Sequence, residues 1–159
     1  MEFCGETMFR GLNAINLDTK GRLTIPTRYR QSLQDICGGK LIITIDTEQQ
    51  CLLVYPTPSW LEIEKKVAAL PSFHPTARRI QRLLIGHATE VEMDANGRLL
   101  VPPPLRDFAE LDKKVALVGQ GNKFECWSDA QWQASRDEWL QERVDIDSDL
   151  PDEVKNLSL

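Results

Sequence analysis

The 159-residue sequence contains no long hydrophobic run, and its four cysteines show no paired spacing. The longest apolar stretches, such as residues 52–55, are far shorter than the ~20 residues that a membrane-spanning helix needs. The first seven residues include two acidic side chains and no basic one, so we expect no secretory signal there. Cysteines without a Cys-x-x-Cys spacing or a histidine nearby predict reduced thiols. We therefore predict a cytoplasmic protein with no cofactor and no metal site.

Charge is distributed unevenly along the chain, whose formal net charge is −5. Residues 137–159 contain eight acidic and two basic side chains, whereas residues 8–40 contain six basic and two acidic ones. Because a phosphate backbone responds to the local charge, the negative total does not exclude nucleic acid as a partner. The N-terminal third is the expected place for phosphate contacts.

An internal repeat divides the sequence. Residues 18–26 read DTKGRLTIP, and residues 94–102 read DANGRLLVP, 76 positions later. Arg30 and Arg106 recur at the same offset. An ordered series of matches over about forty residues indicates a tandem duplication.

Each half predicts the same order of elements. A strand ends at the aspartate, Asp-x-x-Gly forms a tight turn, and a short strand runs to a proline that precedes a short helix. Two strands and a helix with a Ser-x-x-Glu/Gln capping box follow, the helices starting at Ser59 and Ser128. The expected strands are 22–25, 40–45, 51–55, 98–101, 114–118 and 123–127, and a further helix is expected at 75–85. The fold class is therefore mixed α/β and rich in strands.

This reading divides the chain into four parts. They are a first repeat at 12–59, a helical connector at 60–87, a second repeat at 88–131, and a C-terminal helix with an acidic tail at 132–159. In the connector, Arg78, Arg79 and Arg82 fall on one side of the expected helix. They form a solvated basic face, or else an interface or phosphate contact.

Four sets of residues carry a resemblance to a known family: 8–11 (MFRG), the two Asp-x-x-Gly-Arg segments, 78–87 (RRIQRLLIGH) and 119–125 (GQGNKFE). Together they resemble the MraZ family of AbrB-like (SpoVT-AbrB domain) transcription factors, from Met8 to the end of the chain. The resemblance implies an intramolecular swapped-hairpin β-barrel flanked by helices, with each half supplying partner strands. It further implies a ring-shaped homo-oligomer, associated with the nucleoid, that represses its own cell-division and cell-wall operon by binding tandem promoter repeats.

The Asp-x-x-x-Arg spacing suits DNA recognition because a carboxylate across the turn can orient the guanidinium before it binds. An arginine that is bidentate to guanine contributes ~1–3 kcal/mol of base discrimination. The same spacing also fits a structural ion pair, worth ~0–1 kcal/mol at a surface. Given the resemblance, we predict DNA contacts by Arg22 foremost, and by Lys20, Asp18, Arg10, Arg98 and Asp94.

Two other function classes compete with DNA binding. The sequence has no nucleophile elbow, P-loop, HExxH or dinucleotide-binding fingerprint. Asp18 and Asp94 are candidate acids, but an arginine four residues later favours their ionised form. We therefore predict a protein that is not an enzyme. The remaining alternative is an AbrB-like protein-interaction module of the antitoxin type.

Overall fold

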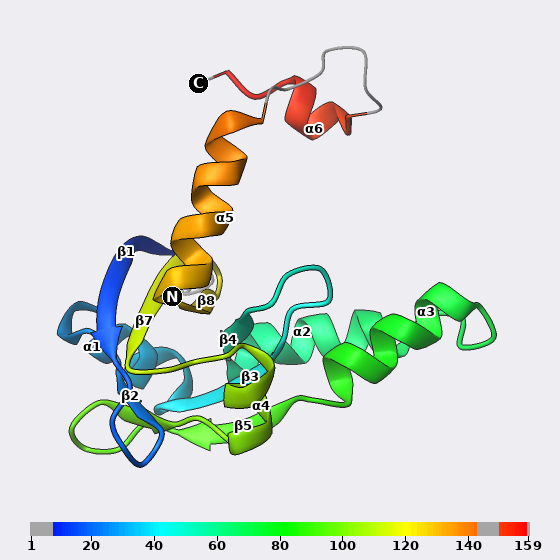
Figure 1. The fold of residues 1–159 in the computed structure, drawn as a ribbon. Coiled ribbons are helices and arrows are strands. Elements are labelled where there is room, and N and C mark those ends of the chain that lie inside the picture. The colour runs from blue at the N-terminus through cyan, green and yellow to red at the C-terminus, as the bar shows by residue number, and fades with distance from the viewer. Residues whose placement is uncertain (1–7, 143–149, 159) are drawn as a thin grey trace.

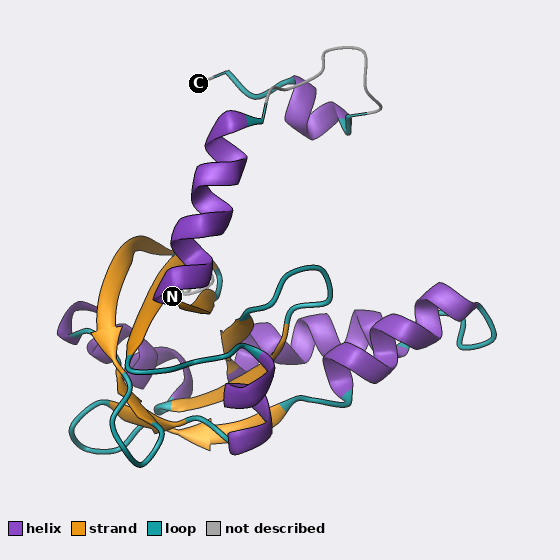
Figure 2. Cartoon of the chain, in the orientation of Figure 1, coloured by secondary structure: helices purple, strands orange, loops and turns teal. Residues whose placement is uncertain are grey.

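The structure is a computed structural model that describes residues 8–142 and 150–158. Its strands are β1 (Phe9–Asn16), β2 (Arg22–Thr24), β3 (Lys40–Ile45), β4 (Leu52–Pro56), β5 (Thr89–Glu92), β6 (Arg98–Leu100), β7 (Lys114–Gly121) and β8 (Phe124–Ser128). Its helices are α1 (Thr27–Cys37), α2 (Thr57–Ala68), α3 (Pro75–Ile80), the π-helical η2 (Gln81–Ile85), α4 (Pro103–Phe108), α5 (Asp129–Gln141) and α6 (Asp152–Lys155). The mixed α/β class is confirmed (Figure 2).

Strand pairing joins the two repeats closely. One sheet has the order β1-β7-β8-β4-β3-β5, and β2 and β6 form a second, two-stranded sheet. Among the strand pairs of the described residues, β3–β4 and β7–β8 lie within one repeat, while β1–β7, β2–β6, β3–β5 and β4–β8 cross between repeats. Each repeat therefore obtains most of its strand-pairing partners from the other.

The strand ladders do not close into the expected barrel. Within the described residues, β1 and β5 are the edges of the six-stranded sheet and do not pair with each other. The strands β2 and β6 are only three residues long and pair with each other in a separate sheet, which Leu23 of β2 links to Leu17, just after β1, by a single antiparallel bridge. The architecture is thus an open sheet with a small second sheet beside it.

The hydrophobic core draws on both repeats. Leu23 and Leu99 face each other across the β2–β6 pair, at 1% and 0% exposure. They belong to one cluster that also contains Phe9 and Phe124, whose ring centroids lie 4.5 Å apart. Fully burying such a side chain contributes ~1.5–3 kcal/mol, so either half alone would lose a large part of its core.

Two helix starts test the capping boxes. Ser128 is the N-cap of α5, and its hydroxyl accepts a hydrogen bond from the Gln131 amide at 3.1 Å, as expected. The prediction for Ser59 is wrong, because α2 begins at Thr57 and contains Ser59 in its first turn. Pro58 explains the earlier start, since proline fits the first turn of a helix, where its missing N–H costs nothing.

The connector forms a helical arm. The helix α2 and the α3–η2 segment run beside each other and extend away from the sheets, whereas α5 leaves the body in a different direction (Figure 1). The expected helix at 75–85 is present, but its last five residues have π-helical hydrogen bonding. No helix in the described part of the chain is long and apolar enough to cross a membrane.

The pairing between repeats predicts that a half-chain does not fold as a monomer. Residues 8–72 expressed alone would lack β5, β6, β7 and β8, leaving β1 and β2 without their partner strands and β3 and β4 with only each other. We expect little amide-exchange protection and rapid proteolysis, whereas the full chain unfolds in one cooperative transition. A protected and monomeric half-chain would contradict this account.

Candidate nucleic-acid interface

The first Asp-x-x-Gly-Arg segment is a turn organised by its aspartate. Oδ1 of Asp18 accepts hydrogen bonds from the backbone amides of Lys20 and Arg22, both at 2.9 Å. Oδ2 accepts from Nε of Arg22 at 2.8 Å. Gly21 has a φ of 83°, a region that favours glycine, and its amide donates to the Asp18 carbonyl at 3.0 Å. The carboxylate therefore fixes both the backbone of the turn and the direction of the arginine.

The second turn repeats this geometry. Oδ1 of Asp94 accepts from the amides of Asn96 and Arg98 at 2.9 and 2.8 Å, and Oδ2 accepts from Nε of Arg98 at 3.0 Å. Gly97 has a φ of 76°. The same hydrogen bonds recur in two different surroundings, so they follow from the motif itself.

Both aspartates have a pKa below the ordinary value. The backbone N–H of Arg22 is the main cause of the lowered pKa of Asp18, and the N–H of Arg98 acts in the same way on Asp94. The guanidinium groups and the second backbone amide of each turn lower it further, against partial desolvation. Each carboxylate is therefore ionised at neutral pH and holds its arginine.

The two turns flank one short antiparallel sheet. Arg22 lies opposite Leu100, and Arg98 lies opposite Thr24, on either side of the buried Leu23–Leu99 pair. Because side chains alternate along a strand, both arginines project from the outer face. The structure thus brings together five of the predicted residues, Asp18, Lys20, Arg22, Asp94 and Arg98. We call the outer side of β2 and β6 with both turns the β2–β6 face.

Charge differs between the two halves of the β2–β6 face. The first turn carries the exposed Lys20, and the equivalent position of the second turn is Asn96. The second repeat also places Glu90 and Glu92 on β5 near its turn. The first turn is therefore the more basic one, as the sequence indicates.

The other predicted residues lie elsewhere. Arg10 is near the start of β1, six residues and ~20 Å of extended strand before Asn16. The arginines of the connector are exposed on the arm, away from the turns (Figure 1): Arg78, Arg79 and Arg82. Arg79 pairs with Glu48 at 3.7 Å and donates to the Thr47 carbonyl. These four residues are not part of the β2–β6 face.

Two further arginines adjoin the turns and were not among the predicted site residues. The Arg106 guanidinium lies over Gly21, and that of Arg30 lies over Gly97. Their recurrence at the offset of 76 was the signal that could have identified them. Sequence alone did not reveal that each one contacts the turn of the opposite repeat.

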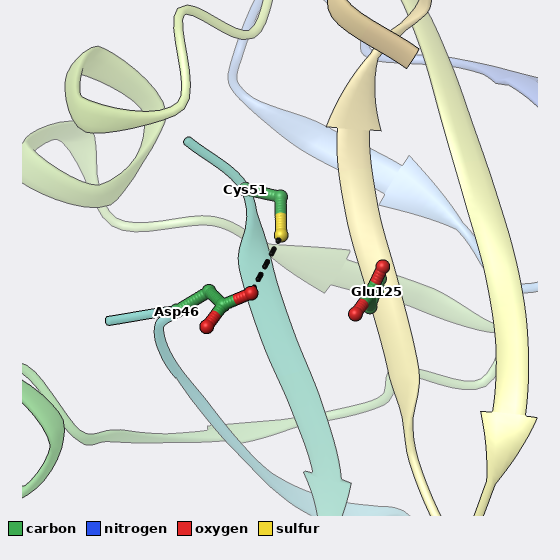
Figure 3. Close-up of side chains that lie close together, drawn as sticks. All are labelled: Asp46, Cys51 and Glu125. Atoms are coloured by element: carbon green, nitrogen blue, oxygen red, sulfur yellow. Dashed lines mark hydrogen bonds between the residues drawn. The ribbon is translucent and has the colours of Figure 1, made fainter. Parts of the chain in front are cut away.

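One group of potential metal ligands occurs at the seam between β4 and β8. The ligand atoms of Asp46, Cys51 and Glu125 lie within 4.8 Å of one another, and the Cys51 thiol donates to Oδ2 of Asp46 at 3.6 Å (Figure 3). Burial, together with the carboxylates of Glu125 and Asp46, raises the pKa of Cys51 far above its ordinary value. The raised pKa keeps the thiol protonated, so that it donates a hydrogen bond to Asp46 at this seam.

Comparison with known proteins agrees with this picture of two repeats that share one motif. Residues 8–83 and 84–149 each match the family described as "MraZ protein, putative antitoxin-like". The chain belongs to the MraZ family.

Relatives align over 152 residues, which is 96% of this chain and their full length. Proteins named "Transcriptional regulator MraZ" are 56% identical in Coxiella burnetii (strain RSA 493 / Nine Mile phase I), 55% in Legionella pneumophila (strain Paris) and 53% in Halorhodospira halophila (strain DSM 244 / SL1).

The turn geometry predicts the titration of both aspartates. In carbon-detected NMR, the Asp18 and Asp94 carboxyl groups should titrate below 3.8. Because folding lowers these pKa values, their contribution to stability is present above the unfolded-state pKa and is lost as the pH falls through the folded-state pKa. Arg22→Gln should raise the pKa of Asp18 only partly, since the backbone amides remain. An ordinary pKa for Asp18 in the folded protein would contradict the turn geometry.

Proposed function

We propose that this protein is a sequence-specific DNA-binding transcriptional regulator that reads promoter DNA with the β2–β6 face. The observation that carries the proposal is the presence of two equivalent Asp–Arg turns at the two ends of one short sheet, with both arginines on its outer face. The names of the MraZ relatives support it. Both turns would enter the major groove, where base edges are distinguishable.

The hydrogen bonds of Arg22 suit it for this task. Its Nε donates to Asp18, while within the described residues its two terminal nitrogens have no protein acceptor. Its side chain is 30% exposed, so those nitrogens can reach a ligand. An arginine already held in one rotamer loses less conformational entropy when it becomes bidentate to guanine. We propose the same role, with lower affinity, for Arg98 in its less basic surroundings.

Contacts with the phosphate backbone of DNA would supply the rest of the affinity. Lys20 is exposed beside Arg22 and would contact phosphate. Arg10 is a proposed phosphate contact too, at the other end of β1. One subunit still offers few cations, and a specific complex usually neutralises several phosphates.

We therefore propose that the protein acts as a homo-oligomeric ring that binds tandem promoter repeats and represses its own cell-division and cell-wall operon. Neighbouring subunits would present the β2–β6 face repeatedly, which raises the effective concentration for each further repeat. The exposed connector residues Arg78 and Arg82 are candidates for the subunit interface. The acidic residues Asp137 and Glu138 on α5 would face away from the duplex, because like charges repel.

A second candidate function is suggested by the words "antitoxin-like" in the family description. A module of that type would bind a partner protein with its exposed surface. Purification from the native host distinguishes the two, since an antitoxin carries a stoichiometric second chain and a promoter-binding ring does not.

Removal of Arg22 should weaken specific recognition of DNA. We expect Arg22→Ala to weaken binding to the DNA upstream of its own gene by about 5- to 150-fold, equivalent to ~1–3 kcal/mol. Arg98→Ala should have a smaller effect in the same mobility-shift assay. Lys65→Ala, which removes one exposed charge on α2, is the matched control and should bind normally. Wild-type affinity of Arg22→Ala, with light scattering showing an intact oligomer, would refute the assignment.

The ring proposal predicts a steep dependence on repeat number. A probe with one repeat should bind near the nonspecific level, at a Kd of ~10⁻⁴–10⁻⁶ M. A second and third repeat at the natural spacing should tighten binding far beyond the statistical factor. A shift of half a helical turn should remove the gain, because it moves one site to the opposite side of the duplex. Equal affinity for one repeat and for the whole promoter would rule out an energetic role of the ring.

A further inference from the structure

Each of the two Asp–Arg turns is covered by an arginine from the opposite repeat. A Cβ atom built on Gly21 would lie 2.5 Å from Cζ and 2.7 Å from Nε of Arg106, which belongs to α4 of the second repeat. A Cβ atom on Gly97 would lie 2.2 Å from Nε of Arg30, which belongs to α1 of the first repeat. The guanidinium groups therefore rest directly against the backbone of the two turns, at the one residue of each turn that has no side chain.

Backbone hydrogen bonds hold each arginine in this position. Nε of Arg106 donates to the Val101 carbonyl at 2.9 Å, and the Val101 amide donates to the Gly21 carbonyl at 2.9 Å. These two hydrogen bonds and the contact of Arg106 with Gly21 connect the first turn to the second repeat at three points.

The second turn is connected to the first repeat by the equivalent contacts. Nε of Arg30 donates to the Ile25 carbonyl at 2.8 Å, and the Ile25 amide donates to the Gly97 carbonyl at 2.7 Å. The same arrangement thus occurs twice in one chain, from sequences that differ at several positions around it. Independent recurrence argues that the geometry is specified by the arginine, the proline-ended strand and the glycine.

Electrostatic pairing does not account for these two arginines. In the part of the chain that the structure describes, neither Arg30 nor Arg106 has a carboxylate within 4 Å. Both are half-buried, and Nε of each is occupied by a backbone carbonyl. Their position is therefore defined by hydrogen bonding to the backbone and by packing on the glycine of the other repeat.

We propose that Arg106 and Arg30 are positioning residues for DNA recognition, each of which sets the turn of the opposite repeat. This inference rests on the proposed function of the β2–β6 face. Arg106 would hold the backbone on which Asp18 orients Arg22, and Arg30 would do the same for Asp94 and Arg98. A planar guanidinium in contact with the turn restricts its motion, which lysine, with its flexible stem, does not reproduce. The two turns then act as a coupled pair.

A crosswise double-mutant cycle tests the proposal in the full-length protein. Affinity for the DNA upstream of its own gene is measured for Arg106→Lys and Arg106→Leu, each alone and combined with Arg22→Ala or Arg98→Ala. We expect Arg106 to couple to Arg22. The fold loss of affinity caused by replacing Arg106 should therefore be smaller, by a factor of about two or more, in the Arg22→Ala background than in the wild type. The fold losses of affinity caused by replacing Arg106 and Arg98 should simply multiply in the double variant, because these two residues are not coupled. Arg30→Lys is the matched variant, and it should couple to Arg98 and not to Arg22.

A second measurement without DNA separates this inference from the function on which it rests. In NMR spectra of the free protein, Arg106→Lys should shift the Asp18 carboxyl and Arg22 Nε–H signals and leave those of Asp94 and Arg98 unchanged. Arg30→Lys should give the opposite pattern. If Arg106→Leu fails to fold, the lysine variant still provides both readouts.

The outcomes are distinct. Crosswise coupling with crosswise NMR shifts supports the positioning role. If Arg106 instead contacts phosphate, Arg106→Leu should reduce the slope of log affinity against log salt concentration by ~0.9, and Arg106→Lys should bind normally. That result overturns the proposal. Coupling of Arg106 to Arg98, or of Arg30 to Arg22, would also overturn the proposal. If Arg22→Ala binds normally while the NMR shifts are crosswise, the proposed function fails and the structural coupling stands.

Discussion

The antiparallel pairing of β2 with β6 is the interaction on which the rest of this structure depends. Three residues make too short a strand to persist alone, and each of these strands has the other as its partner. Their pairing buries Leu23 against Leu99 and places the two Asp–Arg turns at the two ends of one short sheet. The larger sheet follows the same rule, because β1 and β3 of the first repeat take β7 and β5 of the second. Folding and assembly of the candidate site are therefore one event.

Much of this organisation could be predicted from the sequence, because the signals are local. The Asp-x-x-Gly-Arg spacing predicts a turn in which glycine takes a positive φ, and both turns have it. The strand at 40–45 was predicted with the observed bounds. The duplication predicts that the two halves resemble each other, and the family profile matches each half in turn.

The remainder depends on contacts between distant residues. The position of Arg106 over Gly21 is set by the partner repeat, so no local pattern in either segment reveals it. The start of α2 was misplaced because Ser59 forms a good capping motif, while Pro58 fits the first turn of a helix whose N-cap is Pro56, three residues before Ser59. The barrel closure implied by the resemblance is a property of the whole ladder, and the observed ladder remains open. Arg10 was predicted to contact DNA together with Arg22, and the structure places the rest of β1 between the two residues.

Duplication gives the protein two turns of equal geometry and unequal charge. The hydrogen bonds that Asp18 and Asp94 accept match within 0.2 Å, so the backbone scaffold is the same in both turns. Lys20 and Asn96 occupy equivalent positions with different charge. Such a site can keep one mode of contact while its two halves contribute unequally to affinity.

Site-specific photocrosslinking tests most directly whether the β2–β6 face contacts DNA. A benzoylphenylalanine replaces Thr24 or Leu100, both of which are exposed on this face, or Thr76 on the arm as the matched control. With DNA from just upstream of its own gene, the account predicts crosslinks from positions 24 and 100 and none from position 76. Crosslinking from position 76, with positions 24 and 100 silent, would contradict it.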